Sequence, residues 1–438
     1  MRTIPPRVSR TSSGIDPDPL ASEAQWLDRG RSGTRSSPGR IPEDEPRIGT
    51  KESGMKFLVL GGGAQGSAAA YDLLQNDQVE EVVIGDQRTD NVASFLQPFL
   101  DGRLRMEAVD ATDETSVRPA MEGMDAVVCA LPYYFNLPMT RLAIEAGAHF
   151  ADLGGNTQIV EDQRELDEEA RGQGVSVIPD CGLAPGMVNI LAQAGIEELD
   201  DVESVRMWVG GLPQNPEPPL NYQIVYSMEG VLDYYTTPGL VLHEGEPADV
   251  EALTGLEQVS FPEPLGVLEA FYTAGGISTL PFRYRGQLRT MEYKTLRYPG
   301  HAHIMKAIRD LGLLSDEPVA VDGARISPRQ FFIDRVTPKL KRPGGKDLVA
   351  LRVEIRGSRD QDPHTIRFDL LDYFDEGTGI TAMMRTTGFS LALTGVMQCT
   401  GGIREAGVRT PDETIEPLAY IDGLARRGVQ VQRTDLDG

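Results

Sequence analysis

The chain has 438 residues, 40% of them hydrophobic, which is enough for two or three domains of ordinary size. It holds 66 acidic and 42 basic residues, so its formal net charge is −24. Nucleic acids and anionic membranes bind proteins through basic surfaces, so this charge argues against both as partners.

Several further classes of protein can be excluded from the sequence. It contains no apolar run of about 18 residues, so we expect no membrane span. The first residues lack the apolar segment of a secretory signal. The cysteines Cys129, Cys181 and Cys399 are far apart and form no CxxC pair, which argues against a disulfide framework or a metal site. We therefore expect a cytoplasmic protein.

Residues 1–54 differ in composition from everything that follows. The stretch is rich in Gly, Ser, Pro and charged residues and has no apolar periodicity, so it cannot bury enough surface to offset its ordering entropy. We interpret it as a disordered N-terminal extension. Met55 directly precedes the first predicted strand, and we interpret it as the native start.

From Met55 onward, short apolar runs alternate with helical patterns. This alternation predicts an α/β domain over residues 55–186, with a doubly wound parallel (Rossmann) sheet whose size matches two mononucleotide-binding halves. The predicted strands are 56–60, 80–86, 104–110, 124–132, 149–154 and 175–180. The predicted helices are 67–76, 91–100, 114–123, 137–148 and 161–174.

The pattern changes after Gly186. A helix is expected at 187–198, followed by longer strands with alternating polarity at 202–211, 348–357 and 364–374. These predict a second α+β domain over 187–380 with a mixed or antiparallel sheet. Helices are predicted at 381–402 and 417–428. We expect residues 381–438 to pack back onto the first domain.

A glycine motif lies between the first strand and the first helix. The spacing Gly61-x-Gly63-x-x-Gly66 permits a tight turn, close approach to a pyrophosphate and close helix–strand packing. Asp86 ends the second strand, where its carboxylate can accept hydrogen bonds from ribose hydroxyls, so we expect NAD rather than NADP. The nearby Arg88 could instead accommodate the 2′-phosphate of NADP. The alternative interpretation of the whole motif is a glycine turn that binds no ligand. The expected cofactor contacts are Gly61, Gly63, Ala64, Gln65, Gly66, Asp86 and Arg88.

Residues at the ends of the later strands also face the expected crevice, because ligands bind beyond the carboxyl ends of parallel strands. Asp110 follows the third strand and could lie near the adenine or cap a helix. We expect the remaining crevice residues to be Leu131, Pro132, Tyr133, Asp152, Leu153, Gly154 and Gly155.

With these elements placed, several motifs resemble those of one family. The segments "GGGAQG", "ALPYYFN", "IPDCGLAPGM", "LEAFYTAGG" and "MEYKTLRYPGHA" resemble the saccharopine dehydrogenase family, over about residues 55–438. Within it they are most similar to the lysine 6-dehydrogenases. The resemblance implies oxidative deamination of the ε-amino group of L-lysine by NAD, with release of ammonium. It also implies a homodimer with dimer contacts on the substrate domain.

The segment "MEYKTLRYPGHA" concentrates groups suited to this chemistry. Arg297 is the candidate for the substrate carboxylate, because a guanidinium binds carboxylate in a fork. His301 is the candidate for proton transfer, because imidazole titrates near neutral pH. Lys294 is a second candidate base. Each could instead have a purely structural role.

Other candidates lie outside this segment. Asp152 could bind an ammonium or act as a base, and its alternative role is to brace the loop around Gly154 and Gly155. Cys181 would need a nearby base to act as a nucleophile, and the sequence shows none. Further candidates for substrate binding are Tyr133, Tyr222, Glu229 and Glu269.

Two other functions remain open on the sequence alone. A saccharopine or carboxynorspermidine dehydrogenase of the same family would need a second cationic site for carboxylate. Arginines are available for it at Arg283, Arg285, Arg289 and Arg297. The other possibility is a dinucleotide-binding protein without catalytic turnover.

Overall fold

The structure is a computed structural model that describes residues 50–51, 53–403 and 405–437. Most of the predicted N-terminal extension lies outside these residues. Lys51, within the predicted extension, donates hydrogen bonds from Nζ to the Asp125 carboxylate (2.8 Å) and from its backbone N–H to the Cys399 carbonyl (2.9 Å). No helix among the described residues is long and apolar enough to cross a membrane.

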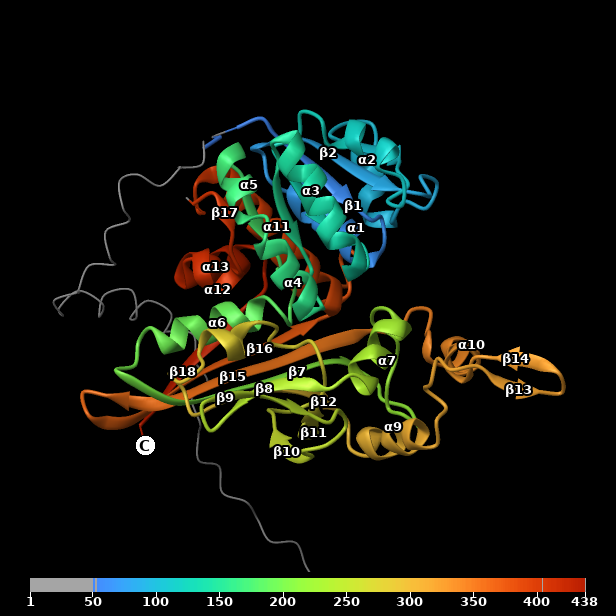
Figure 1. Cartoon of the computed structure of the whole chain (residues 1–438), viewed down its shortest axis with the longest axis vertical. Helices are drawn as coiled ribbons and strands as arrows, with labels where there is room; N and C mark the ends of the chain where they lie inside the picture. Colours follow the sequence, from blue (N-terminus) through green and yellow to red (C-terminus); the bar gives the residue numbers. More distant parts are fainter. Residues whose placement is uncertain (1–49, 52, 404, 438) are drawn as a thin grey trace, which may run out of the picture. The chain divides into compact units, whose positions relative to one another are not determined.

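The first domain contains the predicted parallel sheet (Figure 1), with a seventh strand, β17, that the sequence analysis did not predict beside the six that it did. Its order, β17-β6-β5-β4-β1-β2-β3, places the first and fourth strands side by side at the centre. The crevice beyond their carboxyl ends is where such sheets bind ligands. The strands are β1 (Met55–Leu60), β2 (Val79–Asp86), β3 (Leu104–Ala108), β4 (Ala126–Cys129), β5 (His149–Asp152), β6 (Ser176–Ile178) and β17 (Gly407–Val408).

The helices of this domain follow the predicted alternation, with two differences. Residues 91–100 form only a short 3-10 helix, η1 (Ser94–Phe99), because Pro98 lacks the N–H of a regular α-helix. Residues 161–174 belong to two helices instead of one. The helices are α1 (Ala64–Leu74), α2 (Glu114–Met121), η2 (Tyr133–Phe135), α3 (Asn136–Ala146), α4 (Thr157–Arg164) and α5 (Asp167–Gln173).

The second domain is built on a nine-stranded mixed sheet. β12 runs parallel to β7, and the other pairs are antiparallel. The chain ends in β18, which pairs with β16, so the last strand joins this sheet instead of the first domain. The strands are β7 (Asp201–Pro213), β8 (Gly239–His243), β9 (Glu246–Val250), β10 (Glu257–Ser260), β11 (Val267–Tyr272), β12 (Thr290–Arg297), β15 (Asp347–Arg359), β16 (Asp362–Tyr373) and β18 (Val431–Asp437).

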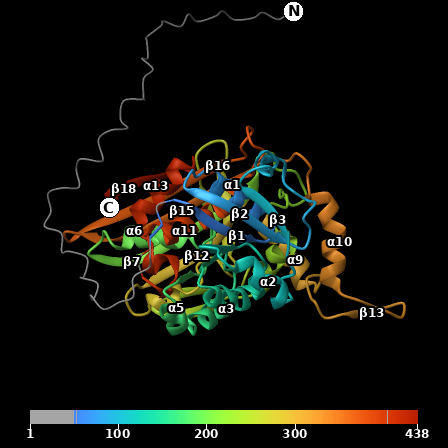
Figure 2. The ribbon, with the colours of Figure 1, turned by 90° about the horizontal axis from the view of Figure 1, so that it is seen from above.

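Helices cover this sheet and connect it to the first domain. A hairpin of two short strands, β13 (Val319–Val321) and β14 (Ala324–Ile326), projects away from the sheet in both views (Figures 1 and 2). The helices are α6 (Met187–Ile196), α7 (Met228–Thr236), α8 (Leu280–Arg283), α9 (His301–Asp310), α10 (Pro328–Leu340), α11 (Ala382–Thr400), α12 (Pro411–Thr414) and α13 (Pro417–Arg426).

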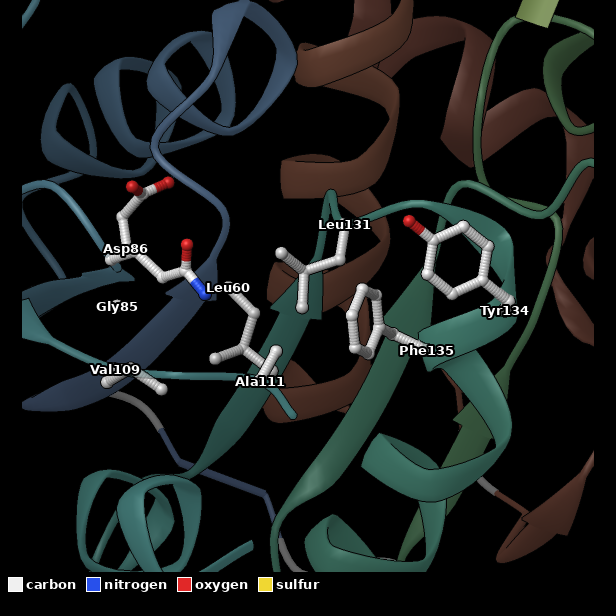
Figure 3. A pocket seen from close by; sticks show the side chains of 9 residues that line it. Leu60, Gly85, Asp86, Val109, Ala111, Leu131, Tyr134 and Phe135 are labelled. Atoms are coloured by element: carbon white, nitrogen blue, oxygen red, sulfur yellow. The ribbon is translucent and has the colours of Figure 1, made fainter. Parts of the chain in front are cut away.

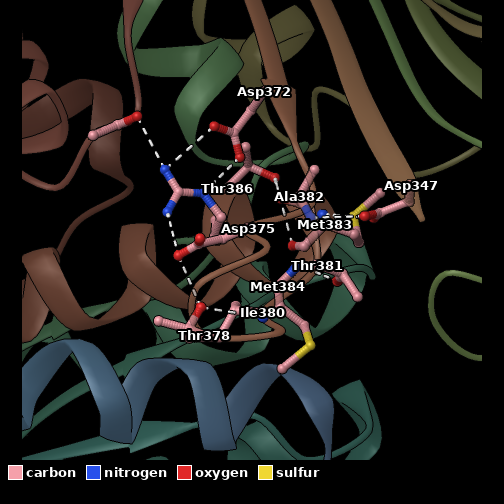
Figure 4. Close-up of polar contacts among 12 residues, drawn as sticks. Asp347, Asp372, Asp375, Thr378, Ile380, Thr381, Ala382, Met383, Met384 and Thr386 are labelled. Carbon is pink, nitrogen blue, oxygen red and sulfur yellow. Dashed lines mark hydrogen bonds and ion pairs between the residues drawn. The ribbon is translucent and has the colours of Figure 1, made fainter. Parts of the chain in front are cut away.

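The long helix α11 is held by both domains. Asp347 of β15 accepts hydrogen bonds from the N–H groups of Ala382 (2.8 Å) and Met383 (2.9 Å) at its start (Figure 4). A carboxylate there satisfies amides that have no partner within the helix. On the other side, a β-carbon at Gly388 would lie 2.7 Å from the carbonyl oxygen of Gln65 in α1. The C-terminal helix therefore packs directly on the first domain, as predicted.

Candidate active site

The glycine motif has the geometry of a phosphate-binding turn. Gly61 has φ +94°, and Gly63 precedes the first turn of α1. A β-carbon at Gly66 would lie 1.8 Å from the Gly61 carbonyl oxygen, so only glycine allows α1 to pack this close to β1. The first amides of a helix point outward without helical partners, which suits a pyrophosphate.

A cavity of about 310 Å³ lies next to this turn (Figure 3). Asp86 stands at its rim, where Oδ2 accepts a hydrogen bond from the Gly62 N–H (2.7 Å) and Oδ1 accepts one from the Arg88 N–H (2.8 Å). The walls are apolar apart from Asp86, Gln87 and Tyr134, so the cavity suits an adenosine. The lining residues are Leu60, Gly85, Asp86, Gln87, Val109, Ala111, Leu131, Tyr134 and Phe135. The glycine turn and this cavity together fit a dinucleotide.

The other predicted cofactor residues occupy different positions. The Arg88 side chain is 71% exposed and pairs with Asp90 at 3.7 Å. Asp110 accepts hydrogen bonds from Thr112 and from Gln87, which itself lines the cavity. Pro132 is exposed and does not line the cavity.

Asp152 is fully buried at the end of β5 and has hydrogen bonds to both oxygens. Oδ1 accepts from the Gly154 N–H (2.7 Å), and Oδ2 accepts from the Gln163 side-chain amide (2.7 Å). Burial raises the pKa of Asp152 to about 6, against the effect of these hydrogen bonds. These contacts match the alternative role of Asp152, which is to brace the loop around Gly154 and Gly155.

Asp180, which directly follows the β6 region, was not singled out from the sequence. Its side chain is completely buried, and neither carboxylate oxygen has a hydrogen bond of good geometry with a described residue, although the Ser278 hydroxyl and the Gly155 N–H lie nearby. Its φ is +63°, in the left-handed region that most side chains avoid. A strained, buried and unpaired carboxyl group is costly, and such groups gather at functional sites.

The surroundings of Asp180 tune its acidity. Burial raises the pKa of Asp180 to about 7, and the charge of Asp152 adds to the rise. The Ser278 hydroxyl and the Gly155 N–H lie close enough to oppose this rise in the pKa of Asp180. Asp180 is therefore a carboxyl group that can take up or release a proton near neutral pH.

A second cavity, of about 230 Å³, lies between the two domains beside Asp180. Gly155 and Ser278, the two neighbours of Asp180, both line it. None of its lining residues is charged, and several carry hydroxyl or amide groups. They are Gly155, Asn156, Thr157, Gln158, Thr237, Pro238, Leu240, Thr273, Ala274, Gly275, Gly276, Ile277, Ser278 and Tyr293.

Arg297 lies behind this pocket at the end of β12, on the same face of the strand as Tyr293. Its side chain is buried, its Nε donates to the Tyr235 hydroxyl (3.1 Å), and its guanidinium lies over the Tyr222 ring at 4.9 Å. It forms no ion pair with a described residue. A buried cation without an acidic partner is a candidate site for an anionic ligand.

Two tyrosines lie near Asp180 and Arg297. Burial raises the pKa of Tyr234, and the nearby Tyr293 and Asp180 raise it further. Burial also raises the pKa of Tyr293, and the charge of Arg297 opposes that rise. Tyr234 is therefore a neighbour of Asp180, and Tyr293, which lines the neutral pocket, is a neighbour of Arg297.

His301 hydrogen-bonds the tyrosine that contacts Arg297, Glu269 caps α9, and neither is among the residues that line the pocket. His301 begins α9; its Nε2 accepts from the Tyr235 hydroxyl (3.0 Å), and its Nδ1 donates to the Leu220 carbonyl (2.9 Å). Burial lowers the pKa of His301 to about 3, so it stays neutral at working pH. Both Glu269 oxygens accept from backbone N–H groups at the start of α9. The contacts of His301 therefore do not support its predicted role in proton transfer.

The remaining predicted residues are not brought to the pocket. Lys294 lies on the opposite face of β12 from Arg297, where it pairs with Glu257 at 3.1 Å. Glu229 is exposed in the first turn of α7. The Cys181 thiol donates to the Ile178 carbonyl, and burial holds its pKa well above its usual range. Tyr133 lies near Tyr234 at the rim of the first domain.

Comparison with known proteins agrees with this arrangement. The profile of the saccharopine dehydrogenase NADP binding domain matches residues 57–178, and that of the saccharopine dehydrogenase C-terminal domain matches residues 182–429. The chain belongs to the saccharopine dehydrogenase family. The two profiles meet between β6 and α6, close to Asp180. The family assignment therefore includes both walls of the crevice.

Individual relatives of this family are distant. The saccharopine dehydrogenase [NADP(+), L-glutamate-forming] of Saccharomyces cerevisiae is 24% identical over 281 residues, which are 60% of this chain and 59% of the relative. The mitochondrial alpha-aminoadipic semialdehyde synthase of Mus musculus is 25% identical over 273 residues, 60% of this chain and 29% of the relative. The chain thus spans less than two thirds of the length of these relatives.

Solved structures establish the fold. Apo saccharopine dehydrogenase (L-Glu forming) from Saccharomyces cerevisiae aligns with a TM-score of 0.71 at 20% identity, over 87% of this chain and 100% of that one. The homospermidine synthase of Legionella pneumophila, solved with NAD, aligns with a TM-score of 0.62 at 12% identity, over 88% of this chain and 92% of that one.

Proposed function

We propose that this chain is an NAD-dependent oxidoreductase that removes the ε-amino group of L-lysine, giving the δ-semialdehyde and ammonium. One observation carries the proposal. Asp180 is a buried carboxyl group without a hydrogen-bond partner among the described residues, and its pKa is about 7. It lies between the dinucleotide crevice and a pocket of neutral polar groups.

Asp180 is the proposed general base. The ε-ammonium of lysine must lose a proton before the adjacent carbon can lose a hydride, and a base with a pKa near 7 can take it. A bound oxidised nicotinamide dinucleotide supplies the hydride acceptor. After passing that proton to solvent, Asp180 takes one from the water that attacks the iminium and returns it to the nitrogen. The C–N bond then breaks, and the ammonia that leaves takes up the hydroxyl proton to become ammonium. The products are aldehyde and ammonium.

Arg297 is the proposed anchor of the α-carboxylate. The other arginines that the sequence offered for a second carboxylate site are all paired with acids: Arg283 with Asp412, Arg285 with Glu246 and Arg289 with Glu244. A substrate with one carboxylate, such as lysine, suits this arrangement better than saccharopine, which has three. Asp152 and His301 are proposed as positioning residues for Gly154 and Tyr235.

NAD is the proposed cofactor because of Asp86. Its carboxylate stands at the rim of the adenosine cavity, where a ribose 2′-hydroxyl could donate to it and a 2′-phosphate would be repelled. The family profile carries NADP in its description, so this preference is specific to the residue at position 86.

A second candidate function is favoured by the printed names of the relatives, which include L-glutamate-forming saccharopine dehydrogenases. Such an activity would oxidise a secondary amine and release L-glutamate instead of ammonium. The buried proton acceptor at Asp180 would serve the same chemical purpose in either reaction.

The deciding experiment follows NADH absorbance and ammonium together when the full chain is incubated with L-lysine and NAD at mildly alkaline pH. We expect one NADH and one ammonium for each lysine consumed. Saccharopine is tested in parallel with NAD and with NADP, and L-glutamate is quantified. Glutamate release without turnover of lysine would replace the first candidate by the second. Cofactor binding without turnover of either substrate would indicate a non-catalytic protein.

A further inference from the structure

The hydroxyl group of Ser278 is buried beside the proposed base and has no structural role among the described residues. Ser278 is 5% exposed, and its Oγ has no hydrogen-bond partner of good geometry there. It does not cap the helix that follows, because Thr279 is the cap residue of α8 and no side chain caps that helix. Burying a hydroxyl group without a partner is costly, so a bound ligand or water is the expected reason for it.

The loop that carries Ser278, between β11 and α8, is fixed by two tyrosine rings. A β-carbon at Gly275 would lie 2.6 Å from the ring of Tyr234. A β-carbon at Gly276 would lie 2.1 Å from the ring of Tyr293, so both rings pack on bare backbone. Ser278 itself has φ +50°, in the left-handed region that glycine adopts with less strain. The fold thus holds a strained serine in place, and its hydroxyl group is unused.

Polar groups without partners converge where this loop meets Asp180. Neither carboxylate oxygen of Asp180 has a hydrogen bond of good geometry, and the Ser278 hydroxyl and the Gly155 N–H lie next to this carboxylate. Gly154 packs against Oδ1 of Asp180, so closely that a β-carbon there would lie 1.7 Å away. Ser278 and Gly155 both line the cavity of about 230 Å³. The three groups therefore form one polar site at the edge of that cavity.

The donors and acceptors of this site suit a water molecule. A buried water makes about three hydrogen bonds to polar groups. The Asp180 carboxylate and the Ser278 oxygen can accept its two hydrogens, and the Gly155 N–H can donate to its oxygen, which leaves one lone pair free. An ammonium group offers no acceptor to the Gly155 N–H, so it fits the same groups less well.

We propose that Ser278 and Gly155 hold the water that attacks the iminium carbon, while Asp180 takes its proton. This assignment rests on the proposed function, whose reaction consumes that water. The water oxygen forms a bond to the carbon, the electron pair of the C=N bond moves to the nitrogen, and one water proton moves to Asp180. Hydride transfer comes earlier and needs no water. Ser278 therefore acts on hydrolysis and not on oxidation.

Two variants separate these steps when NADH and ammonium are followed after rapid mixing of the full chain with NAD and L-lysine. Ser278→Ala removes the hydroxyl group, and Ser278→Gly also relieves the left-handed backbone, so it should fold even where alanine is poorly tolerated. In both variants we expect one NADH per active site at the wild-type rate, followed by turnover about tenfold to 100-fold slower. Ser260→Ala, at an exposed site on β10, is the control and should behave as the wild type does.

The intermediate that should accumulate is identified by quenching the slow phase with borodeuteride. This reagent converts the iminium into lysine with one deuterium on its ε-carbon, and we expect this product to build up in the Ser278 variants alone. A first NADH slowed as much as turnover would indicate a structural role and overturn the inference. Turnover at the wild-type rate in either variant would also overturn it.

The same design distinguishes this inference from the choice of substrate. If the wild-type chain turns over saccharopine and not lysine, the release of L-glutamate replaces that of ammonium and deuterated saccharopine replaces deuterated lysine, because that reaction also hydrolyses an imine. Slow hydrolysis in the Ser278 variants would then support the water site although the substrate proposal had failed. A wild-type chain that turns over neither substrate would overturn both.

Discussion

Gly154 and Asp180 are in direct contact across the crevice: a β-carbon at Gly154 would lie 1.7 Å from Oδ1 of Asp180. Both residues have left-handed backbones, with φ +65° and +63°. Gly154 lies in the loop after β5, and Asp180 follows β6. The position of Asp180, the proposed base, therefore depends on residue 154 having no side chain.

The first prediction concerns this contact. Gly154→Ala should displace Asp180 and lower kcat/KM about 100-fold, because shifts of about 1 Å at a reacting group have effects of that size. Gly172→Ala is the control: nothing lies within 4 Å of its β-carbon, so activity should be unchanged. Steady-state kinetics on both variants provide the measurement, and an active Gly154→Ala enzyme would contradict the proposed geometry.

Asp180→Asn should lower kcat by about 10² to 10⁴, the usual contribution of a general base, while NADH still binds. In the wild-type enzyme kcat should rise with pH and level off above about pH 7, because Asp180 must be ionised to act. Asp249→Asn, at an exposed site on β9, should leave both the rate and its pH dependence unchanged. A wild-type profile that is flat between pH 6 and 8 would argue against Asp180 as the base.

The same substitution should stabilise the fold. The ordinary pKa of an aspartate is 3.8, and burial raises that of Asp180 to about 7, so between these values the native chain holds a proton that the unfolded chain has lost. Wild-type stability therefore falls as pH rises through this interval. Asp180→Asn removes the effect, and its free energy of unfolding should exceed that of wild type by up to about 4 kcal/mol at pH 8. The gain should shrink toward pH 5 in urea titrations; an equal gain at both pH values would indicate another cause.

Arg297→Met should raise KM for the substrate about tenfold to 100-fold, the effect of losing a charged hydrogen bond of about 1.5–3 kcal/mol. Methionine keeps most of the apolar length of the side chain, so folding should tolerate it. Arg289→Met removes a surface arginine paired with Glu244 and should leave KM unchanged. If the Arg297 variant altered only kcat, the residue would not be the carboxylate anchor.

Asp86→Ser should shift cofactor preference toward NADP. Serine removes the charge that would repel a 2′-phosphate, and the ratio of Kd values for NADPH and NADH should change about tenfold, or 1.4 kcal/mol. Asp77→Ser, at an exposed turn before β2, should not change this ratio. Fluorescence titration with both reduced cofactors measures it, and an unchanged ratio would remove Asp86 as the discriminating residue.

Some site residues could be predicted from the sequence because their signals are local. The glycines at 61, 63 and 66 stand between a strand and a helix, and Asp86 ends the next strand; a parallel sheet brings these positions together in any protein of this class. Strand alternation also shows that Lys294 and Arg297, three residues apart, face opposite sides of β12, so one of the two candidates could have been excluded in advance.

Other assignments depended on contacts that no local pattern reveals. Asp152 ends β5, and Asp180 follows β6 of the same sheet. Only Asp152 receives hydrogen bonds on both oxygens, because Gln163 and Gly154 happen to reach it. The pKa of a free imidazole predicts a role in proton transfer for His301, whereas burial and the charge of Arg297 keep this histidine neutral.

By itself, the sequence determined the alternation of strands and helices in the first domain, the doubly wound sheet, the glycine turn for a dinucleotide and the family resemblance, since apolar periodicity and glycine spacing act over a few residues. Only the tertiary structure decided which carboxyl group is left unpaired, which arginine lacks an acidic partner and which apolar strands stay uncovered. These properties depend on burial and on partners from distant parts of the chain, such as Asp412, which pairs with Arg283.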